Sequence, residues 1–247
     1  MKAIMLAAGV GARLSNNDET HVPKCLLQFD GQSLLARHIE ILQTSGIEKL
    51  TLVVGYRADD IRDELIAIDA LDYVETVVNP DYRDGSIVSL SCAADTMRSG
   101  ADILFMDADV LCDPALVQKL VATHENSHIL YDTEFEPGDE PVMLCLKDDQ
   151  IIEFQKNVDI ECDILGEWPG FVKWSPEAAE KIAGIIERFV SEGSVEQPYE
   201  QAFREYMLNP TSSRIKSENI TGLPWIEIDF PEDLTRAHNI ILPLLKA

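Results

Sequence analysis

Two basic side chains and a short glycine-rich loop near the N-terminus have the composition of a phosphate-binding site. Gly9 and Gly11 directly follow a strand-like segment, and glycines at such a turn let backbone N–H groups approach a phosphate closely. Arg13 lies in the loop and Lys24 follows Pro23, so a guanidinium and an ammonium could together neutralise a triphosphate. The loop has neither the third glycine of a dinucleotide-binding fingerprint nor the Gly-Lys-Ser/Thr of a Walker A loop. It therefore predicts a nucleotide site of another type, with a tight turn carrying surface charges as the alternative.

A pair of aspartates follows an apolar segment in the middle of the chain. Asp107 and Asp109 come at the carboxyl end of a predicted strand, where ligands of open α/β sheets bind. Residues two apart in an extended segment face the same side, so both carboxylates could point into one site. Carboxylate oxygens, together with substrate phosphates and water, are the ligands that Mg²⁺ prefers. The pair therefore predicts a magnesium site, with a solvated acidic loop as the alternative.

The elements that must position these groups alternate between strands and helices in the first half of the chain. Apolar runs and helical spacing predict strands at residues 2–7, 50–54, 73–78 and 102–106, and helices at residues 33–44, 58–68, 86–97 and 114–123. This order predicts an α/β fold with a three-layer, mostly parallel, Rossmann-like sheet. The second half is mixed, with predicted strands at residues 128–132, 142–147, 151–156, 169–174 and 225–228, and helices at residues 176–190, 198–206 and 231–245.

The loop and the segments after it resemble the nucleotidyltransferases that activate sugar phosphates and small phospho-alcohols. The resemblance rests on residues 6–14, 23–27, 31–35, 53–56, 79–80, 107–109 and 227–229. It extends over nearly the whole chain and implies a sheet of the nucleotide-diphospho-sugar transferase type with a small mixed acceptor-side subdomain. Ala12 departs from the family, in which Ser or Thr is common at this place. No linker or repeat is evident, so we predict one domain, with a nucleotide-binding half at residues 1–125 and an acceptor-binding half at residues 126–247.

The resemblance implies a role for each of the residues already singled out. In the family the loop wraps the base and the phosphates, which places Arg13 and Lys24 on the phosphates. Asp109 becomes the principal Mg²⁺ ligand and Asp229, from the distant Glu-Ile-Asp segment, its partner. The implied nucleotide-binding residues are Leu6, Ala7, Ala8, Gly9, Gly11, Arg13, Lys24, Gly85, Ser86 and Asp107.

Further segments resemble the cytidylyltransferases for phosphocholine and for 2-aminoethylphosphonate. These segments are residues 79–82, 85–90, 155–157, 199–200 and 225–229, and residues 138–140 and 151–157 resemble the acceptor half of the wider family. The acceptors of those enzymes carry an amine or a quaternary ammonium, which a carboxylate and aromatic faces can hold. The resemblance makes Lys156 the lysine that contacts the acceptor phosphate or the α-phosphate, and we take Tyr199, Glu200 and Trp225 as candidates for the cationic group. The alternatives are a surface lysine at Lys156 and a solvated helix acid at Glu200.

The implied activity is Mg²⁺-dependent transfer of CMP from CTP to a small amine-bearing phosphate or phosphonate, with release of pyrophosphate. An acceptor oxygen that is already ionised needs no general base, so catalysis consists of positioning and charge neutralisation. The predicted catalytic residues are Arg13 and Lys24, which stabilise the departing pyrophosphate, and Lys156, which draws the two anions together. The alternatives are UTP in place of CTP, a sugar-1-phosphate or inositol-phosphate nucleotidyltransferase, a catalytically silent nucleotide-binding regulator, and a structural interaction protein.

The charge of the chain limits its partners. The 247 residues include 44 acidic and 20 basic side chains, a formal net charge of −24. Residues 1–50 contain five of each kind, so the excess lies wholly in the remainder of the chain. Nucleic acids and anionic membranes are therefore not expected as partners, whereas a homo-oligomer is compatible with the sequence.

The cysteine pattern and the apolar runs predict a cytoplasmic protein. The five cysteines, which are Cys25, Cys92, Cys112, Cys145 and Cys162, have neither metal-site nor disulfide spacing. We therefore expect reduced thiols in the cytoplasm. The apolar runs are too short to span a bilayer.

Overall fold

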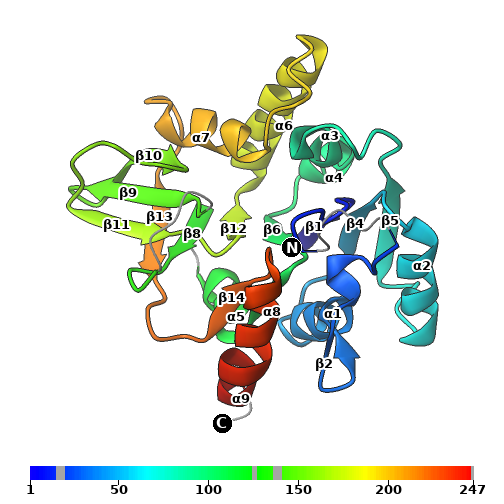
Figure 1. Cartoon of the computed structure of the whole chain (residues 1–247). Coiled ribbons are helices and arrows are strands. Elements are labelled where there is room, and N and C mark those ends of the chain that lie inside the picture. The colour runs from blue at the N-terminus through cyan, green and yellow to red at the C-terminus, as the bar shows by residue number, and fades with distance from the viewer. Residues whose placement is uncertain (15–19, 124–126, 136–140, 246–247) are drawn as a thin grey trace.

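The computed structural model describes residues 1–14, 20–123, 127–135 and 141–245, and within them seven strands form one sheet that crosses the molecule (Figure 1). In spatial order these strands are β13 (Ile215–Asn219), β8 (Ser127–Tyr131), β12 (Phe171–Trp174), β6 (Ile103–Asp107), β1 (Lys2–Ala7), β4 (Leu50–Val54) and β5 (Val74–Val78). Strand β12 runs antiparallel to both neighbours, and the other pairs are parallel. The predicted mostly parallel α/β sheet is confirmed.

Helices cover both faces of the sheet (Figure 1). One face packs against α3 (Ser86–Ser91), α4 (Ala94–Met97), α6 (Pro176–Ser191) and α7 (Glu200–Leu208), and the other against α1 (Leu34–Thr44), α2 (Ala58–Ala67) and α5 (Ala115–Ala122). Side chains alternate across β1, so Ile4 joins the first core while Ala3 and Met5 join the second. Serine hydroxyls fix the starts of two helices, because Ser33 caps α1 and Ser175 caps α6.

A smaller antiparallel sheet stands beside the main one, as the mixed second half predicts. It consists of β10 (Gln150–Gln155), β9 (Met143–Lys147) and β11 (Ile164–Glu167) in that order. Helix α7 is tied to it by Arg204, whose Nε and Nη2 donate to the two carboxylate oxygens of Glu153 at 2.6 and 2.8 Å. Such a bidentate pair fixes orientation as well as distance, so α7 and the small sheet are held in register.

A two-stranded ribbon joins the middle of the chain to its C-terminal segment. It pairs β7 (Val110–Cys112) with β14 (Trp225–Glu227), and Ile228 N donates to Asp109 O at 3.0 Å. The remaining elements are a 3₁₀ turn (Lys24–Leu26), the hairpin β2 (Gln28–Phe29) and β3 (Gln32–Ser33), α8 (Pro231–Arg236), a π-helical segment (Ala237–Ile241) and α9 (Leu242–Leu244). The ribbon thus carries Asp229 to the carboxyl end of β6.

Several element boundaries differ from the prediction. The helix expected at residues 86–97 is divided into α3 and α4, and the one expected at residues 231–245 contains the π-helical segment. The strand expected from residue 169 begins at Phe171, because Gly170 has a φ of +85° and cannot continue a strand. Strands β2, β3, β7, β11 and β13 were not predicted, since they are short or, like β13, polar edge strands. The division into two functional halves at residue 125 stays a prediction.

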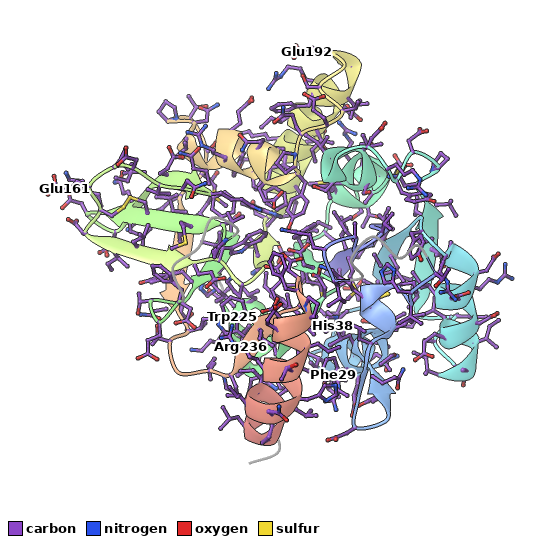
Figure 2. The ribbon with its side chains drawn as sticks, viewed as in Figure 1. Phe29, His38, Glu161, Glu192, Trp225 and Arg236 are labelled. Carbon is purple, nitrogen blue, oxygen red and sulfur yellow. A yellow bond between two sulfur atoms is a disulfide. The ribbon has the colours of Figure 1, made fainter. Side chains whose placement is uncertain are left out.

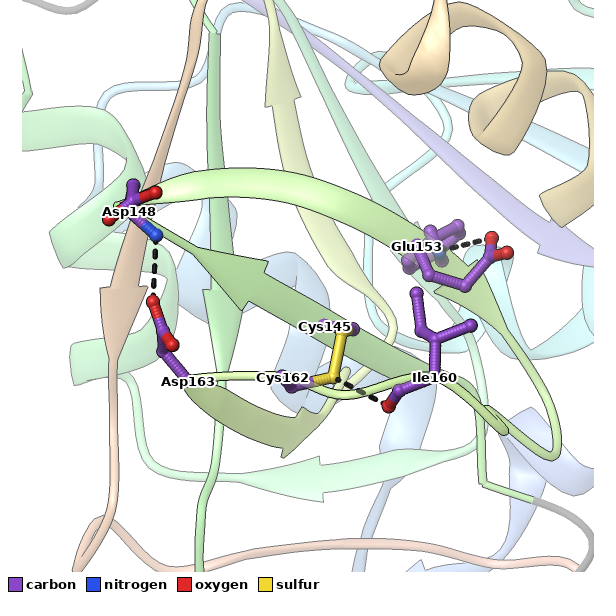
Figure 3. The surroundings of a disulfide bond; sticks show 7 residues. Cys145, Asp148, Glu153, Ile160, Cys162 and Asp163 are labelled. Atoms are coloured by element: carbon purple, nitrogen blue, oxygen red, sulfur yellow. Dashed lines mark hydrogen bonds between the residues drawn. A yellow bond between two sulfur atoms is a disulfide. The ribbon is translucent and has the colours of Figure 1, made fainter.

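A disulfide between Cys145 and Cys162 corrects the expectation of five reduced thiols (Figure 3). Cys145 lies on β9, Cys162 precedes β11, and their Cα atoms are 5.6 Å apart. Antiparallel pairing of β9 with β11, which places Leu165 opposite Cys145, brings the two positions together. Cys25, Cys92 and Cys112 are free thiols. The bridge closes a loop of chain from Cys145 to Cys162, which includes β10.

None of the helices in the described part of the chain combines the length and the apolar character that a bilayer crossing requires.

A buried histidine connects α1 to the ribbon and predicts a pH-dependent stability. His38, labelled in Figure 2, is 1% exposed, and its Nε2–H donates to Val110 O at 2.7 Å. Burial lowers the pKa of His38 to about 4 from an ordinary value of 6.5, so the folded protein holds the ring neutral. Because the unfolded chain accepts the proton more readily, this contribution to stability is complete above about pH 6.5 and is lost as the pH falls toward 4.

We therefore expect His38 alone to lower the free energy of unfolding by about 2 kcal/mol between pH 8 and pH 5. His38→Gln removes the titrating group and retains an amide donor for Val110. The change in the free energy of unfolding between pH 8 and pH 5 should therefore be smaller in this variant by that amount. Urea unfolding of both proteins at the two pH values measures it. Equal pH dependence in the two proteins would contradict the assignment.

Candidate active site

A pocket of about 280 Å³ lies at the carboxyl ends of β1 and β6. It is lined by the end of β1, by the glycine-rich loop with Arg13, by Lys24 and by the segment Asp107–Asp109. Parallel pairing sets Leu6 beside Asp107, so the loop and the acidic segment leave the sheet together. The structure thus brings together the groups that the sequence predicted for the triphosphate and the metal.

The two loop glycines act differently. Gly9 has open space where a side chain would stand, so the backbone is accessible from that side. Gly11 has a φ of +68°, and a Cβ there would lie 3.2 Å from Lys24 Cγ and 3.3 Å from His21 Nε2. Gly11 therefore permits both the left-handed turn and the passage of the Lys24 stem beneath it.

Basic and acidic side chains converge at one end of the pocket. Lys24 Nζ lies 2.9 Å from Asp109 Oδ2 and 2.5 Å from Asp229 Oδ1, and Arg13 Nη2 lies 3.0 Å from Asp229 Oδ2. A third acid, Glu227, joins them, since ligand oxygens of Asp109, Glu227 and Asp229 lie within 4.8 Å of one another. An all-carboxylate donor set fits a hard cation such as Mg²⁺.

Glu227 was not among the predicted site residues. The signal that could have revealed it is its spacing from Asp229, which equals the two-residue spacing used for Asp107 and Asp109. Glu227 is exposed at the end of β14. Desolvation by the surrounding protein atoms and the charges of Asp109 and Asp229 raise the pKa of Glu227 to about 8. Burial alone would lower the pKa of Lys24, but the same two aspartates raise it overall, so Lys24 stays an ammonium.

The side chain of Asp107 is held in a closed cradle beside this cluster. The Tyr199 hydroxyl donates to Asp107 Oδ2 at 2.6 Å, and Asp107 N donates to Gly170 O at 3.1 Å. A Cβ on Gly170 would lie 2.7 Å from Asp107 Oδ2, so only glycine leaves room for the carboxylate. Burial and the charges of Asp109 and Glu227 raise the pKa of Asp107.

Gly85 and Ser86, predicted to bind the nucleotide, contact a connecting segment that we call the strap, residues 195–199. Gly85 N donates to Val195 O at 2.8 Å, and Ser86 Oγ accepts a hydrogen bond from Tyr199 N at 3.0 Å. A Cβ on Gly85 would lie 2.4 to 2.6 Å from backbone atoms of residues 195–197. These two residues therefore set the position of the strap and, through it, of Tyr199; a nucleotide contact stays a prediction.

The predicted acceptor residues divide into two groups. Lys156, at the end of β10, interacts electrostatically with Glu200 at the start of α7. One carboxylate oxygen of Glu200 is buried and has no hydrogen-bond partner among the described residues. Tyr199 is a core residue that uses its hydroxyl on Asp107, and Trp225 (Figure 2) donates from Nε1 to Asp132 Oδ2 at 2.8 Å. Residues 138–140 lie outside the described residues.

Comparison with known proteins decides the family. A family model described as the MobA-like NTP transferase domain matches residues 3–153. The chain belongs to this family. The predicted resemblance to nucleotidyltransferases is confirmed.

Three relatives align with this NTP transferase over nearly its whole length. A CTP:phosphoglutamine cytidylyltransferase of Campylobacter jejuni is 26% identical, and the match covers 95% of this chain and 98% of the relative. The solved structure of a CTP:phosphocholine cytidylyltransferase from Streptococcus pneumoniae is 25% identical, with a TM-score of 0.77 and coverage of 97% and 98%. An inositol-1-phosphate CTP transferase from T. maritima, at 19% identity, shares the fold with a TM-score of 0.79 and coverage of 99% and 94%.

Proposed function

We propose that this NTP transferase is a Mg²⁺-dependent cytidylyltransferase that transfers CMP from CTP to a small acceptor bearing both a phosphate or phosphonate and an amine. The convergence of Arg13 and Lys24 on the carboxylates of Asp109 and Asp229 supports nucleotidyl transfer. Two relatives that align over nearly their whole length, from Campylobacter jejuni and Streptococcus pneumoniae, are cytidylyltransferases of phosphoglutamine and phosphocholine, which supports CTP.

The buried carboxylate of Glu200 supports an acceptor with a cationic group. A carboxylate oxygen buried without a hydrogen-bond partner is costly, and a cationic ligand would satisfy it. Burial raises the pKa of Glu200 and the positive charge of Lys156 lowers it, so an ammonium ligand would further favour the ionised form. Lys156, next to Glu200, would take the anionic end of the same acceptor.

The residues of the chain supply positioning and charge. Lys156 brings the acceptor anion to the α-phosphate, and Arg13 and Lys24 stabilise the charge that develops on the leaving pyrophosphate. The acceptor oxygen is already ionised, so no side chain needs to remove a proton. Asp109 and Asp229, with Glu227, would hold Mg²⁺, which when bound neutralises phosphate charge. The cytoplasm, predicted from the cysteine spacing, stays a proposal, and the Cys145–Cys162 disulfide takes two of the five thiols out of the argument for it.

A pyrophosphate-release screen tests the proposal. We expect release with CTP and phosphocholine, 2-aminoethylphosphonate or phosphoglutamine, and little with UTP or with sugar 1-phosphates. Glu200→Gln should raise the KM for the preferred amine-bearing acceptor by roughly ten- to a hundredfold, because the cation loses a desolvated charge partner. Glu205→Gln, a change of an exposed acid on the same helix, is the matched control. Preference for sugar 1-phosphates, or nucleotide binding without any pyrophosphate release, would refute the proposal.

A further inference from the structure

The ammonium of Lys24 lies between the two carboxylates that fit a metal ion. It contacts one oxygen of Asp109 at 2.9 Å and one oxygen of Asp229 at 2.5 Å. Arg13 contacts the other oxygen of Asp229 at 3.0 Å. The side chains of Lys24, Asp109 and Asp229 are only 15%, 21% and 13% exposed, so solvent screens these contacts weakly. A lysine and a divalent cation would therefore use the same oxygen atoms.

The stem of Lys24 leads beneath the glycine-rich loop. Its Cγ lies 3.2 Å, and its Cε 3.4 Å, from the place where a Gly11 side chain would begin. The ammonium is thus tethered under the loop that the triphosphate would occupy, and rotation about the flexible stem can turn it from carboxylate toward phosphate. Both kinds of oxygen partner are anionic, so Lys24 can exchange one for the other without losing charge pairing.

We propose that Lys24 is a tethered counter-ion that competes with the divalent cation for Asp109 and Asp229. The triphosphate provides the alternative partner that releases Lys24 from the two aspartates. The metal and the nucleotide then bind cooperatively. The nucleotide draws Lys24 away from the aspartates that the metal needs, and the metal displaces Lys24 toward the phosphates of the nucleotide. The metal enters together with the nucleotide, and the nucleotide-free protein holds it weakly. This inference rests on the proposed function only in assuming that an anionic nucleotide occupies the loop.

Binding of Mn²⁺ alone to the nucleotide-free protein, followed by electron paramagnetic resonance, tests this inference. Removing a unit charge from direct contact with the metal ligands should tighten binding, so Lys24→Met is expected to bind Mn²⁺ on the order of thirtyfold more tightly than the unmodified protein. Lys24→Gln, which keeps a polar group, should show the same direction if the methionine variant folds poorly. Lys181→Met, which removes an exposed lysine from α6, should leave Mn²⁺ binding unchanged.

A second measurement uses thermal unfolding without nucleotide. Mg²⁺ should raise the Tm of Lys24→Met, or of Lys24→Gln, more than that of the unmodified protein. Equal or weaker Mn²⁺ affinity in both Lys24 variants overturns the inference. Because neither measurement contains CTP or an acceptor, a screen that reveals another nucleotide or acceptor would refute the proposed function and leave this inference standing.

Discussion

Asp109→Asn should lower the rate of pyrophosphate release by roughly a thousandfold, because it removes a negative charge from the centre of the site. Asparagine keeps the size of the side chain, and Asp109 O still accepts from Ile228 N through the backbone, so the β7–β14 ribbon should persist. Lys24 would retain only Asp229 as its carboxylate partner. The expected defect therefore lies in the site rather than in the fold.

The loss in Asp109→Asn is measured as kcat at saturating CTP and Mg²⁺, with circular dichroism and Tm as checks on folding. Asp63→Asn is the matched control, because Asp63 is an exposed acid on α2, remote from the pocket lining. It should keep full activity. Turnover of Asp109→Asn within about threefold of the unmodified protein would remove Asp109 from the proposed metal site.

Gly85→Ala should impair activity through the strap rather than through the nucleotide. The added Cβ would lie 2.4 Å from Gln197 O, and backbone atoms cannot rotate away as a side chain can. The strap must shift, and with it Tyr199, which donates to Asp107, and Glu200, which begins α7. We expect a loss of about 1–3 kcal/mol in the free energy of unfolding and at least a roughly tenfold fall in kcat/KM for the acceptor.

Gly184→Ala is a natural control for this change. Gly184 lies inside α6, and a Cβ there meets nothing within 4 Å. Alanine favours a helix over glycine, so this variant should gain about 0.5–1 kcal/mol and keep its activity. Denaturant unfolding should show a lower stability for Gly85→Ala and a higher stability for Gly184→Ala. Acceptor kinetics should show a lower kcat/KM in Gly85→Ala alone. A Gly85→Ala protein as stable and active as the unmodified one would show that the strap accommodates a methyl group.

Local patterns predicted much of the fold and the centre of the site. The loop with Arg13, the Pro-Lys pair ending in Lys24 and the acidic segment at Asp109 are each contiguous in sequence, and the loop and the acidic segment each follow a well-marked apolar strand. The contact between Gly85 and residues 195–197 joins segments more than a hundred residues apart, and no local pattern signals it. The hydrogen-bond partners of Tyr199 and Trp225 could not be predicted for the same reason, since Asp107 and Asp132 are distant in sequence.

The disulfide was missed for a related physical reason. Cysteine spacing identifies a pair only when the intervening turn is known, and here the bridge depends on β11 pairing with β9. Strand β11, with the sequence Ile-Leu-Gly-Glu, is short and contains a glycine, so it lacks the alternation that marks a half-buried strand. Prediction failed where register between strands, rather than composition, decides the contact.

The ribbon of β7 and β14 also determines when a growing chain can complete its acidic cluster. Asp109 is synthesised 118 residues before Glu227 and 120 residues before Asp229. A nascent chain can therefore form the glycine-rich loop early, yet its acidic cluster is completed only after β14 has left the ribosome and paired with β7. A growing chain that has not yet reached β14 therefore carries the glycine-rich loop without the complete acidic cluster.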